Sequence, residues 1–435
     1  MILIKIITLT FLSKSANLFI SYFTKQGVVM LRKFYERYAE LALTYGVNLQ
    51  KDGKLEILCP TECEEFGLII AEKAYIKGAK MVNITWDNQH LDALTYKYAK
   101  KDELIKIPDW FVAKKNSLID DNTSYIAIDA DYPLIFNGLD EEKIASHRSA
   151  RAKAIKRYHD AVMSNEIRWC VVSAPSKEWA NMVFDNDENA YDKLMNAIAK
   201  TMRIDNDDYL SAWQKHLDTL KNRSEYLNAK SYDALHFKNS LGTDITVGLA
   251  KNHLWCSAKE RAKDGVEFVA NLPTEEVFTA PNKNYVNGTV KSALPLAYNG
   301  NIVDGFSLTF KDGKIIDFNA DKGYETLKQL IETDEGTHYL GEVALIGKNS
   351  PIAKSGILFY NTLFDENASC HLAIGKGYPT TVIDGANLTD EQLLALGVND
   401  SVEHVDFMIG TSDLTIDGIK DGKKEPIFID GEWWI

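Results

Sequence analysis

Residues 341–378 begin with G-E-V-A-L-I-G and end with F-D-E-N-A-S-C-H-L-A-I-G-K-G-Y. Four polar side chains, Glu342, Glu366, His371 and Tyr378, stand there among small and apolar neighbours. The residues around Glu342 alternate too little for a solvent-facing strand, so the sequence predicts a carboxylate inside a largely apolar sheet. Burying a carboxylate costs free energy unless its charge is compensated. A metal ion would compensate it.

Two further segments combine polar and apolar residues in the same way. Residues 271–281 read N-L-P-T-E-E-V-F-T-A-P, and in an extended chain Glu275 and Glu276 point to opposite faces, so one of them is expected to face the site. Residues 401–410 read S-V-E-H-V-D-F-M-I-G, which places His404 and Asp406 on one face of a strand.

The three segments together offer six candidate metal ligands, which are Glu276, Glu342, Glu366, His371, His404 and Asp406. This set is rich in carboxylates and contains no thiol, which suits zinc, cobalt, manganese or magnesium better than a structural zinc held by cysteines. Each segment alone is weak evidence, because a lone glutamate on an apolar strand is as often half of a buried ion pair, and an H-x-D pair is more often a surface feature. Their common position in the last third or so of the chain favours a metal site.

These segments resemble the signature segments of the aminopeptidase T, aminopeptidase S and PepS family of two-metal exopeptidases. The resemblance extends from about Met30 to the C-terminus and includes residues 175–180 and 232–249. It implies that all six candidates bind two divalent metal ions, that Glu342 is the favoured bridging ligand, and that Tyr378 faces the same site. It also implies zinc, cobalt or similar ions, broad substrate preference and a homodimer.

The function implied by the resemblance is metal-dependent hydrolysis of the N-terminal peptide bond of peptides with a free N-terminus. Two ions about 3.5–4 Å apart would share a water molecule, lower its pKa and polarise the scissile carbonyl. Glu275 or Glu276 would act as the general base, and carboxylates that bind no metal could hold the substrate's ammonium group. Tyr378 would either donate a hydrogen bond to the developing oxyanion or position a ligand.

Two other classes of function remain as alternatives. One is a different two-metal hydrolase, an amidohydrolase or a phosphoesterase, although no basic cluster that could grip a phosphate lies near the candidate ligands. The other is a non-catalytic binding protein in which metal ions only stabilise the fold.

The amino-acid composition limits which partners the protein can bind and which cellular compartment it can occupy. The chain has 435 residues, 45% of them hydrophobic, and a formal net charge of -13 at pH 7. The acidic balance and the absence of a basic stripe argue against a nucleic-acid partner. An odd number of cysteines, five, spread over a chain of this length, predicts free thiols in a reducing compartment, here the cytoplasm.

Residues 1–29 form an apolar extension interrupted by Lys5, Lys14 and Lys25. These lysines leave no uncharged run long enough to span a bilayer, so no membrane association is expected. The leading interpretation is an extension of the reading frame that does not belong to the working protein, and the alternative is a signal or anchoring segment. We therefore expect a chain that begins at Met30 to fold and to be active.

The remaining pattern predicts an α/β domain over residues 30–240, followed by an α+β, β-rich catalytic domain over 241–435. Strand-like runs at 54–58, 81–86, 124–130 and 167–175 alternate with helical periodicity, including helices at 64–77 and 141–163, which predicts a mostly parallel sheet. After residue 240, N-G or D-G pairs at 287–288, 299–300, 304–305 and 312–313 indicate antiparallel hairpins. Four histidines, His90, His147, His159 and His216, lie on polar helical stretches and are expected to be solvated.

Overall fold

The structure is a computed structural model that describes residues 31–435. The apolar extension predicted at residues 1–29 lies outside the described residues. The described chain begins with a helix over residues 31–41, which continues into a π-helical turn, η1 (Ala42–Gly46). None of the described helices combines the length and apolar character needed to cross a bilayer.

Five parallel strands form the first sheet, in the order β2-β1-β3-β4-β9. They are β1 (Lys54–Pro60), β2 (Met81–Asp87), β3 (Ser124–Asp129), β4 (Trp169–Ser173) and β9 (Asn271–Leu272). The helices of this half are α2 (Glu64–Ile76), α3 (Gln89–Tyr98), α4 (Lys101–Leu104), α5 (Asp109–Asp120), α6 (Glu141–Ala154), α7 (Lys156–Met163), α8 (Lys177–Val183), α9 (Ala190–Thr201) and α10 (Tyr209–Lys230). The predicted parallel α/β arrangement is therefore confirmed, and its fifth strand, β9, comes from beyond residue 240.

The single helix predicted over residues 141–163 is wrong, because the chain breaks at Ile155 into α6 and α7. The side chain of Ile155 is buried in a small core with Leu118 of α5 and Tyr158 of α7. The break lets α7 pack against α5, whereas α6 packs against α4 at the other end. Burial of this apolar cluster thus overrides the continuous helical pattern of the sequence.

Antiparallel sheets make up the second half. An eight-stranded sheet has the order β15-β14-β11-β6-β5-β19-β20-β21, and a four-stranded sheet has the order β10-β16-β17-β18. The larger sheet contains β5 (Ala234–Lys238), β6 (Asp244–Leu249), β11 (Pro281–Lys291), β14 (Ser307–Lys311), β15 (Lys314–Asn319), β19 (Thr415–Lys420), β20 (Lys423–Ile429) and β21 (Glu432–Trp433). The smaller sheet contains β10 (Val277–Thr279), β16 (Leu340–Leu345), β17 (His371–Gly375) and β18 (His404–Met408).

Short elements complete this half. Two small hairpins pair β7 (Lys259–Arg261) with β8 (Glu267–Val269) and β12 (Leu296–Tyr298) with β13 (Asn301–Val303). The helices are α11 (Tyr324–Ile331), α12 (Pro351–Ser355), α13 (Thr362–Asp365) and α14 (Asp390–Leu396), and the 3-10 turns of the chain are η2 (Thr61–Cys63), η3 (Gly336–His338), η4 (Glu366–Ala368), η5 (Pro379–Thr381) and η6 (Gly385–Asn387).

Two of the four glycine pairs are hairpin turns: residues 299–300 connect β12 to β13, and residues 312–313 connect β14 to β15. The hairpin expected at Asn287 and Gly288 is wrong, because both residues lie inside β11 and pair with β6, and Gly288 also pairs with β14. Gly288 has a φ of +123°, and a Cβ atom there would lie 2.3 Å from the carbonyl oxygen of Asp244. Glycine is therefore required at this position, because a side chain would collide with the neighbouring strand.

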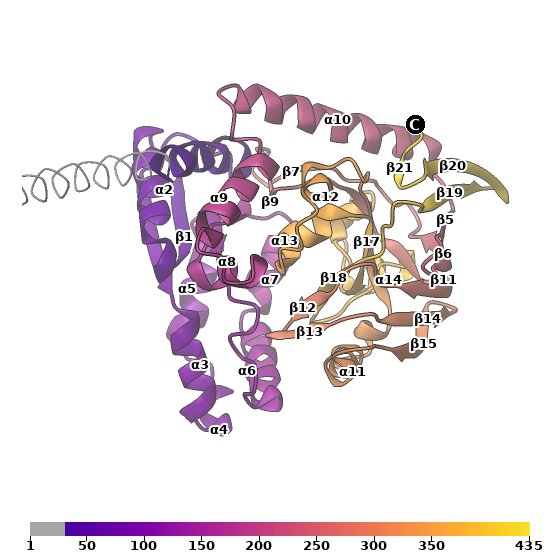
Figure 1. The fold of residues 1–435 in the computed structure, drawn as a ribbon, viewed down its shortest axis with the longest axis horizontal. Helices are drawn as coiled ribbons and strands as arrows, with labels where there is room; N and C mark the ends of the chain where they lie inside the picture. Colours follow the sequence, from indigo (N-terminus) through magenta and orange to yellow (C-terminus); the bar gives the residue numbers. More distant parts are fainter. Residues whose placement is uncertain (1–30) are drawn as a thin grey trace, which may run out of the picture.

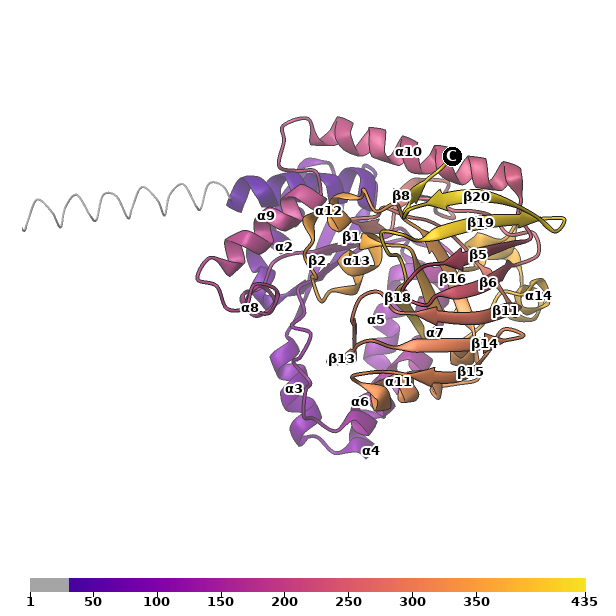
Figure 2. The ribbon, with the colours of Figure 1, turned by 45° about the vertical axis from the view of Figure 1, so that its right-hand side comes forward.

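One hydrophobic core joins the two halves, since it includes Ile57 and Val172 of the parallel sheet as well as Val343 and Ile416 of the antiparallel sheets. Figures 1 and 2 show the long helix α10 running along the edge of the molecule from the α8–α9 region to the larger sheet. The four-stranded sheet is the most deeply covered element, because every residue of β16 and β17 is buried. Polar side chains on these strands are consequently enclosed by protein.

Candidate metal centre

The register of the four-stranded sheet brings four of the predicted ligands to one face. Glu342 on β16 is paired with Ala373 on β17, which is in turn paired with Asp406 on β18. His371 lies two residues before Ala373, and His404 lies two residues before Asp406, so their side chains share that face. The small side chain of Ala373 leaves space between the carboxylates on either side of it.

The other predicted residues reach the same pocket from the ends of the strands. Glu276 directly precedes β10, Glu366 begins η4 just before β17, and Tyr378 follows β17. All seven predicted site residues line a single pocket. The structure thus brings together every residue that the sequence analysis selected for the site, and their role as ligands stays a prediction.

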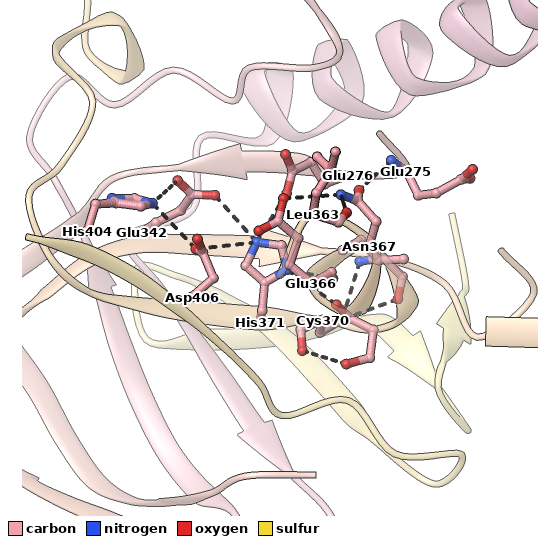
Figure 3. A network of polar contacts seen from close by, with 12 residues as sticks. Glu275, Glu276, Glu342, Leu363, Glu366, Asn367, Cys370, His371, His404 and Asp406 are labelled. Atoms are coloured by element: carbon pink, nitrogen blue, oxygen red, sulfur yellow. Dashed lines mark hydrogen bonds and ion pairs between the residues drawn. The ribbon is translucent and has the colours of Figure 1, made fainter. Parts of the chain in front are cut away.

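Glu342 lies between two groups of potential ligands (Figure 3). The first group is Glu276, Glu342 and His371, and the second is Glu342, His404 and Asp406. Within each group, one potential ligand atom from every residue lies within 4.8 Å of the others. Oε1 of Glu342 is 3.6 Å from Nε2 of His371, and Oε2 of Glu342 is 3.5 Å from Nε2 of His404. One carboxylate therefore faces both groups, with one oxygen toward each.

Hydrogen bonds to main-chain carbonyls orient both imidazoles. Nδ1 of His371 lies 2.9 Å from the carbonyl oxygen of Glu366, and Nδ1 of His404 lies 2.6 Å from that of Lys376. A carbonyl oxygen only accepts hydrogen bonds, so each Nδ1 must be the donor. In the neutral ring the lone pair then lies on Nε2, which points toward the carboxylates and is free to bind a metal ion.

The charge of the pocket favours bound cations. Four of the predicted ligands are carboxylates, and none of the described residues that line the pocket is a lysine or an arginine. Burial raises the pKa of Glu342 to about 7. Oε2 of Glu276 and Oδ1 of Asp406 are buried without accepting a hydrogen bond. Buried carboxylate oxygens without donors, next to Nε2 atoms oriented as ligands, fit one or more divalent cations.

Tyr378 is positioned by two aromatic contacts. Its ring packs edge to face against His404, with ring centres 5.0 Å apart, and against Phe278, at 5.9 Å. Burial, followed by the charges of Glu342 and Asp406, raises the pKa of Tyr378 well above its usual value. The phenol therefore stays protonated and presents a hydrogen-bond donor to the pocket.

Glu275 does not belong to the pocket, although the sequence left it open as the general base. Its carboxylate turns away (Figure 3) and forms an ion pair with Arg203, whose Nη1 lies 2.7 Å from Oε1. Only Glu276 of the adjacent pair faces the pocket, as the extended-chain argument predicted. The expectation that His216 is solvated is wrong, because its side chain is only 10% exposed behind Glu275, with Nε2 2.7 Å from the carbonyl oxygen of Thr274.

Sequence reasoning missed Glu260, which also lines the pocket. It lies in the middle of β7 between Lys259 and Arg261, a run of charges that is typical of a solvated strand. Lys259 and Arg261 are indeed exposed, but strand alternation turns Glu260 to the opposite side, where it is partly buried. Burial raises the pKa of Glu260 to about 7. Nothing in the local sequence distinguishes this residue from its neighbours.

Two cavities meet at His404. The inner pocket has a free volume of about 40 Å³ and is lined by the predicted ligands, Glu260 and Trp169. A larger cavity of about 600 Å³ is also lined by His404. Its charged lining consists of five carboxylates (Asp160, Asp334, Glu335, Asp400 and Glu403) and three lysines (Lys153, Lys156 and Lys376). His404 is therefore shared by the pocket of the candidate metal centre and by a wider cavity.

A mixed α/β chain with a buried cluster of carboxylates and imidazoles next to a cavity has the ligand set of a metal-dependent enzyme. The chain belongs to the thermophilic metalloprotease family M29, whose family model matches residues 32–433. It is 45% identical over 404 residues to Aminopeptidase 2 of Geobacillus stearothermophilus, covering 92% of this chain and 98% of that protein.

Two further relatives agree with this assignment. Aminopeptidase AmpS of Bacillus subtilis is 43% identical over 399 residues, which cover 91% of this chain and 97% of that protein. The solved structure of wild-type AmpT from Thermus thermophilus superposes with a TM-score of 0.85 at 36% identity, covering 92% of this chain and 99% of that one. The predicted family, the predicted fold class and the enzyme class of metalloaminopeptidase are confirmed.

Proposed function

We propose that this enzyme removes N-terminal residues from peptides with a free N-terminus by means of two divalent metal ions. The observation that carries the proposal is the position of Glu342, which faces two ligand groups with one carboxylate oxygen toward each. A single metal ion would need only one such group. A carboxylate shared by both groups is what a paired centre requires.

Glu276, Glu342 and His371 would hold one ion, and Glu342, His404 and Asp406 would hold the other. Glu366 lines the same pocket and would complete the ligand set. When bound, such ions lower the pKa of water toward neutrality and polarise the scissile carbonyl. Zinc, cobalt, manganese or magnesium would all suit these oxygen and nitrogen ligands.

Residues of the chain itself would carry out the parts of the reaction that the metal ions do not supply. Glu275 is paired with Arg203 outside the pocket, and Glu276 would already be engaged as a metal ligand, so neither glutamate of the pair would be left as a free general base. The protonated phenol of Tyr378 would donate a hydrogen bond to the oxyanion that develops on the carbonyl. The larger cavity beyond His404 would hold the residues that follow the cleaved bond. We further propose that the enzyme is a cytoplasmic homodimer that binds neither nucleic acid nor membranes.

The alternative of a phosphoesterase receives less support. A phosphate group entering the inner pocket would meet the carboxylates of the cluster without a lysine or arginine among the described lining residues. A peptide that presents a cation, its N-terminal ammonium, suits this charge better.

Metal removal tests the proposal. Dialysis against a strong chelator should lower hydrolysis of L-leucine p-nitroanilide at least tenfold, because the carboxylate cluster alone has no means of polarising the carbonyl. Reloading with zinc, cobalt, manganese or magnesium, each alone, should restore activity with at least one of them and give close to two ions per chain by elemental analysis. Full activity in the stripped enzyme, or saturation at one ion per chain, would contradict the two-metal proposal.

Tyr378→Phe separates the two roles considered for the phenol. Loss of one hydrogen-bond donor to an oxyanion typically lowers kcat by about a hundredfold or more. We expect a fall of that size with metal content and KM nearly unchanged, because the ring and its contacts with His404 and Phe278 remain. If the variant instead loses metal, Tyr378 positions a ligand and is not the oxyanion donor.

A further inference from the structure

Glu260 is a carboxylate of the inner pocket that the metal centre does not use. It does not belong to either group of potential metal ligands. Five carboxylates line this pocket, and Glu260 is the one outside the predicted ligand set. It nevertheless lines the same pocket as the cluster, where burial, with a further contribution from the charge of Glu276, raises its pKa to about 7.

No cation of the described chain compensates this carboxylate. The nearby cations are engaged elsewhere: Lys259 and Arg261 form ion pairs with Glu267 on the neighbouring strand β8, and Lys263 forms one with Glu166. The partner of Glu260 is a neutral amide, since Nδ2 of Asn165 donates a hydrogen bond to Oε2. Its charge is therefore left for a cation that enters the pocket to compensate.

Asn165 orients the carboxylate from a fixed position in the main chain. The asparagine is buried, and its main-chain carbonyl oxygen accepts a hydrogen bond of 2.9 Å from the main-chain N–H of Lys263, which follows β7. The hydrogen bond from Asn165 occupies one oxygen of Glu260. Oε1 of Glu260 is left available to a group that enters the pocket.

Glu260 lies in the pocket where the N-terminus of a substrate would have to bind. The ammonium nitrogen of a peptide is separated from the first carbonyl carbon by a single Cα atom, so an ammonium site must lie in the same pocket as the groups that act on that carbonyl. Glu260 lines that pocket together with the predicted metal ligands and Tyr378.

We propose that Glu260, oriented by Asn165, binds the α-ammonium group of the substrate. This inference rests on the proposed function and deepens it by assigning the residue that makes the enzyme specific for chain ends. It also accounts for a buried carboxylate without a cationic partner, because the substrate supplies that partner in each catalytic cycle.

A pair of inhibitors that differ only in the amino group tests the assignment. L-Leucine carries the ammonium group, and 4-methylpentanoate is the same molecule without it. In Glu260→Gln the inhibition constant for L-leucine should rise about ten- to hundredfold, because a charge-assisted hydrogen bond is replaced by a neutral one. The constant for 4-methylpentanoate should change less than about twofold, and the metal content should equal that of the wild type.

The control is Glu225→Gln on α10, which removes a charge at a side chain that is 63% exposed and that lines neither cavity. This variant should bind both inhibitors like the wild type. Glu260→Asp keeps the charge but shortens the side chain, and should give an inhibition constant for L-leucine between those of the wild type and Glu260→Gln. If Glu260→Gln does not fold, Glu260→Asp takes its place in the comparison.

Three outcomes would overturn the inference: loss of metal from Glu260→Gln, equal weakening of both inhibitors, or unchanged binding of L-leucine. Each of these leaves the proposed aminopeptidase activity of the wild type intact. Failure of the metal-loaded wild type to hydrolyse any substrate with a free N-terminus would instead overturn the proposed function itself.

Discussion

Glu342→Gln is expected to lower kcat/KM by about a thousandfold or more, which corresponds to about 4 kcal/mol of lost transition-state stabilisation. The substitution removes one negative charge at the point where the two ligand groups meet, while the side chain keeps nearly the same size and shape. The two oxygens of Glu342 lie 3.6 Å from Nε2 of His371 and 3.5 Å from Nε2 of His404. In glutamine one of them becomes an NH2 group that cannot bind a metal ion, and the other becomes a neutral carbonyl oxygen that binds one more weakly. Fewer than two ions per chain should be retained, and the activation of water and the polarisation of the carbonyl should fail together.

The fold of this variant should survive, because its cluster carries one charge fewer and the buried strand β16 keeps its packing. Glu332→Gln is the matched control: Glu332 is an exposed glutamate at the end of α11, ten residues earlier in the chain, and should give wild-type activity and metal content. Elemental analysis, circular dichroism and thermal melting would accompany the kinetics. A Glu342→Gln variant that melts like the parent, keeps two ions and turns over normally would contradict the paired centre.

The residues of the candidate centre could be predicted because they break the pattern of their own strands. Glu342 and His371 stand in runs that are otherwise apolar or small, and both strands proved to be buried along their whole length. A polar side chain in such a run has no solvent to face, so its chemistry is visible in the sequence alone. The pairing of β16, β17 and β18 that brings these residues to one face required the three-dimensional structure.

Residues whose role depends on a distant partner could not be predicted. Glu275 and Glu276 are adjacent and chemically identical, and only the position of Arg203, 72 residues earlier, shows which of them is neutralised outside the pocket. His216 lies on a polar helix and becomes buried because it packs behind that ion pair. Glu260 is similar, because the exposed charges on either side conceal a side chain that points inward.

The fold, like the site, could be predicted where it depends on neighbouring residues and could not be predicted where it depends on residues far apart in the sequence. Alternating strands and helices were sufficient to predict the parallel sheet, because each strand and the helix that follows it are encoded side by side. The fifth strand, β9, is only two residues long and joins from beyond the antiparallel β5, β6 and β7. No local pattern distinguishes so short a strand from a loop, and its place beside β4 is set by tertiary packing.

N-acetylation of a peptide substrate is expected to lower kcat/KM at least about a thousandfold, an effect of about 4 kcal/mol or more. Acetylation replaces a cation by a neutral, larger group in the inner pocket. It removes a charge-assisted hydrogen bond worth about 1.5–3 kcal/mol, leaves the carboxylate of Glu260 uncompensated, and adds an acetyl group to a pocket that must also hold the metal ions and the scissile carbonyl. Because the steric and electrostatic costs act together, the combined loss should exceed that of Glu260→Gln acting on an unmodified substrate.

The matched modification is amidation of the C-terminus of the same peptide, which should change kcat/KM by less than about threefold. The cavity beyond His404 is lined by more carboxylates than lysines, and two of its lysines are already paired, Lys156 with Asp160 and Lys376 with Asp400. A C-terminal carboxylate therefore finds no strong partner there, and its removal costs little. Leu-Gly-Gly, its acetylated form and its amide can be compared by quantifying the released products. Comparable rates on the acetylated peptide would exclude recognition of the free N-terminus, and a large loss on amidation would place the charge recognition at the opposite end of the substrate.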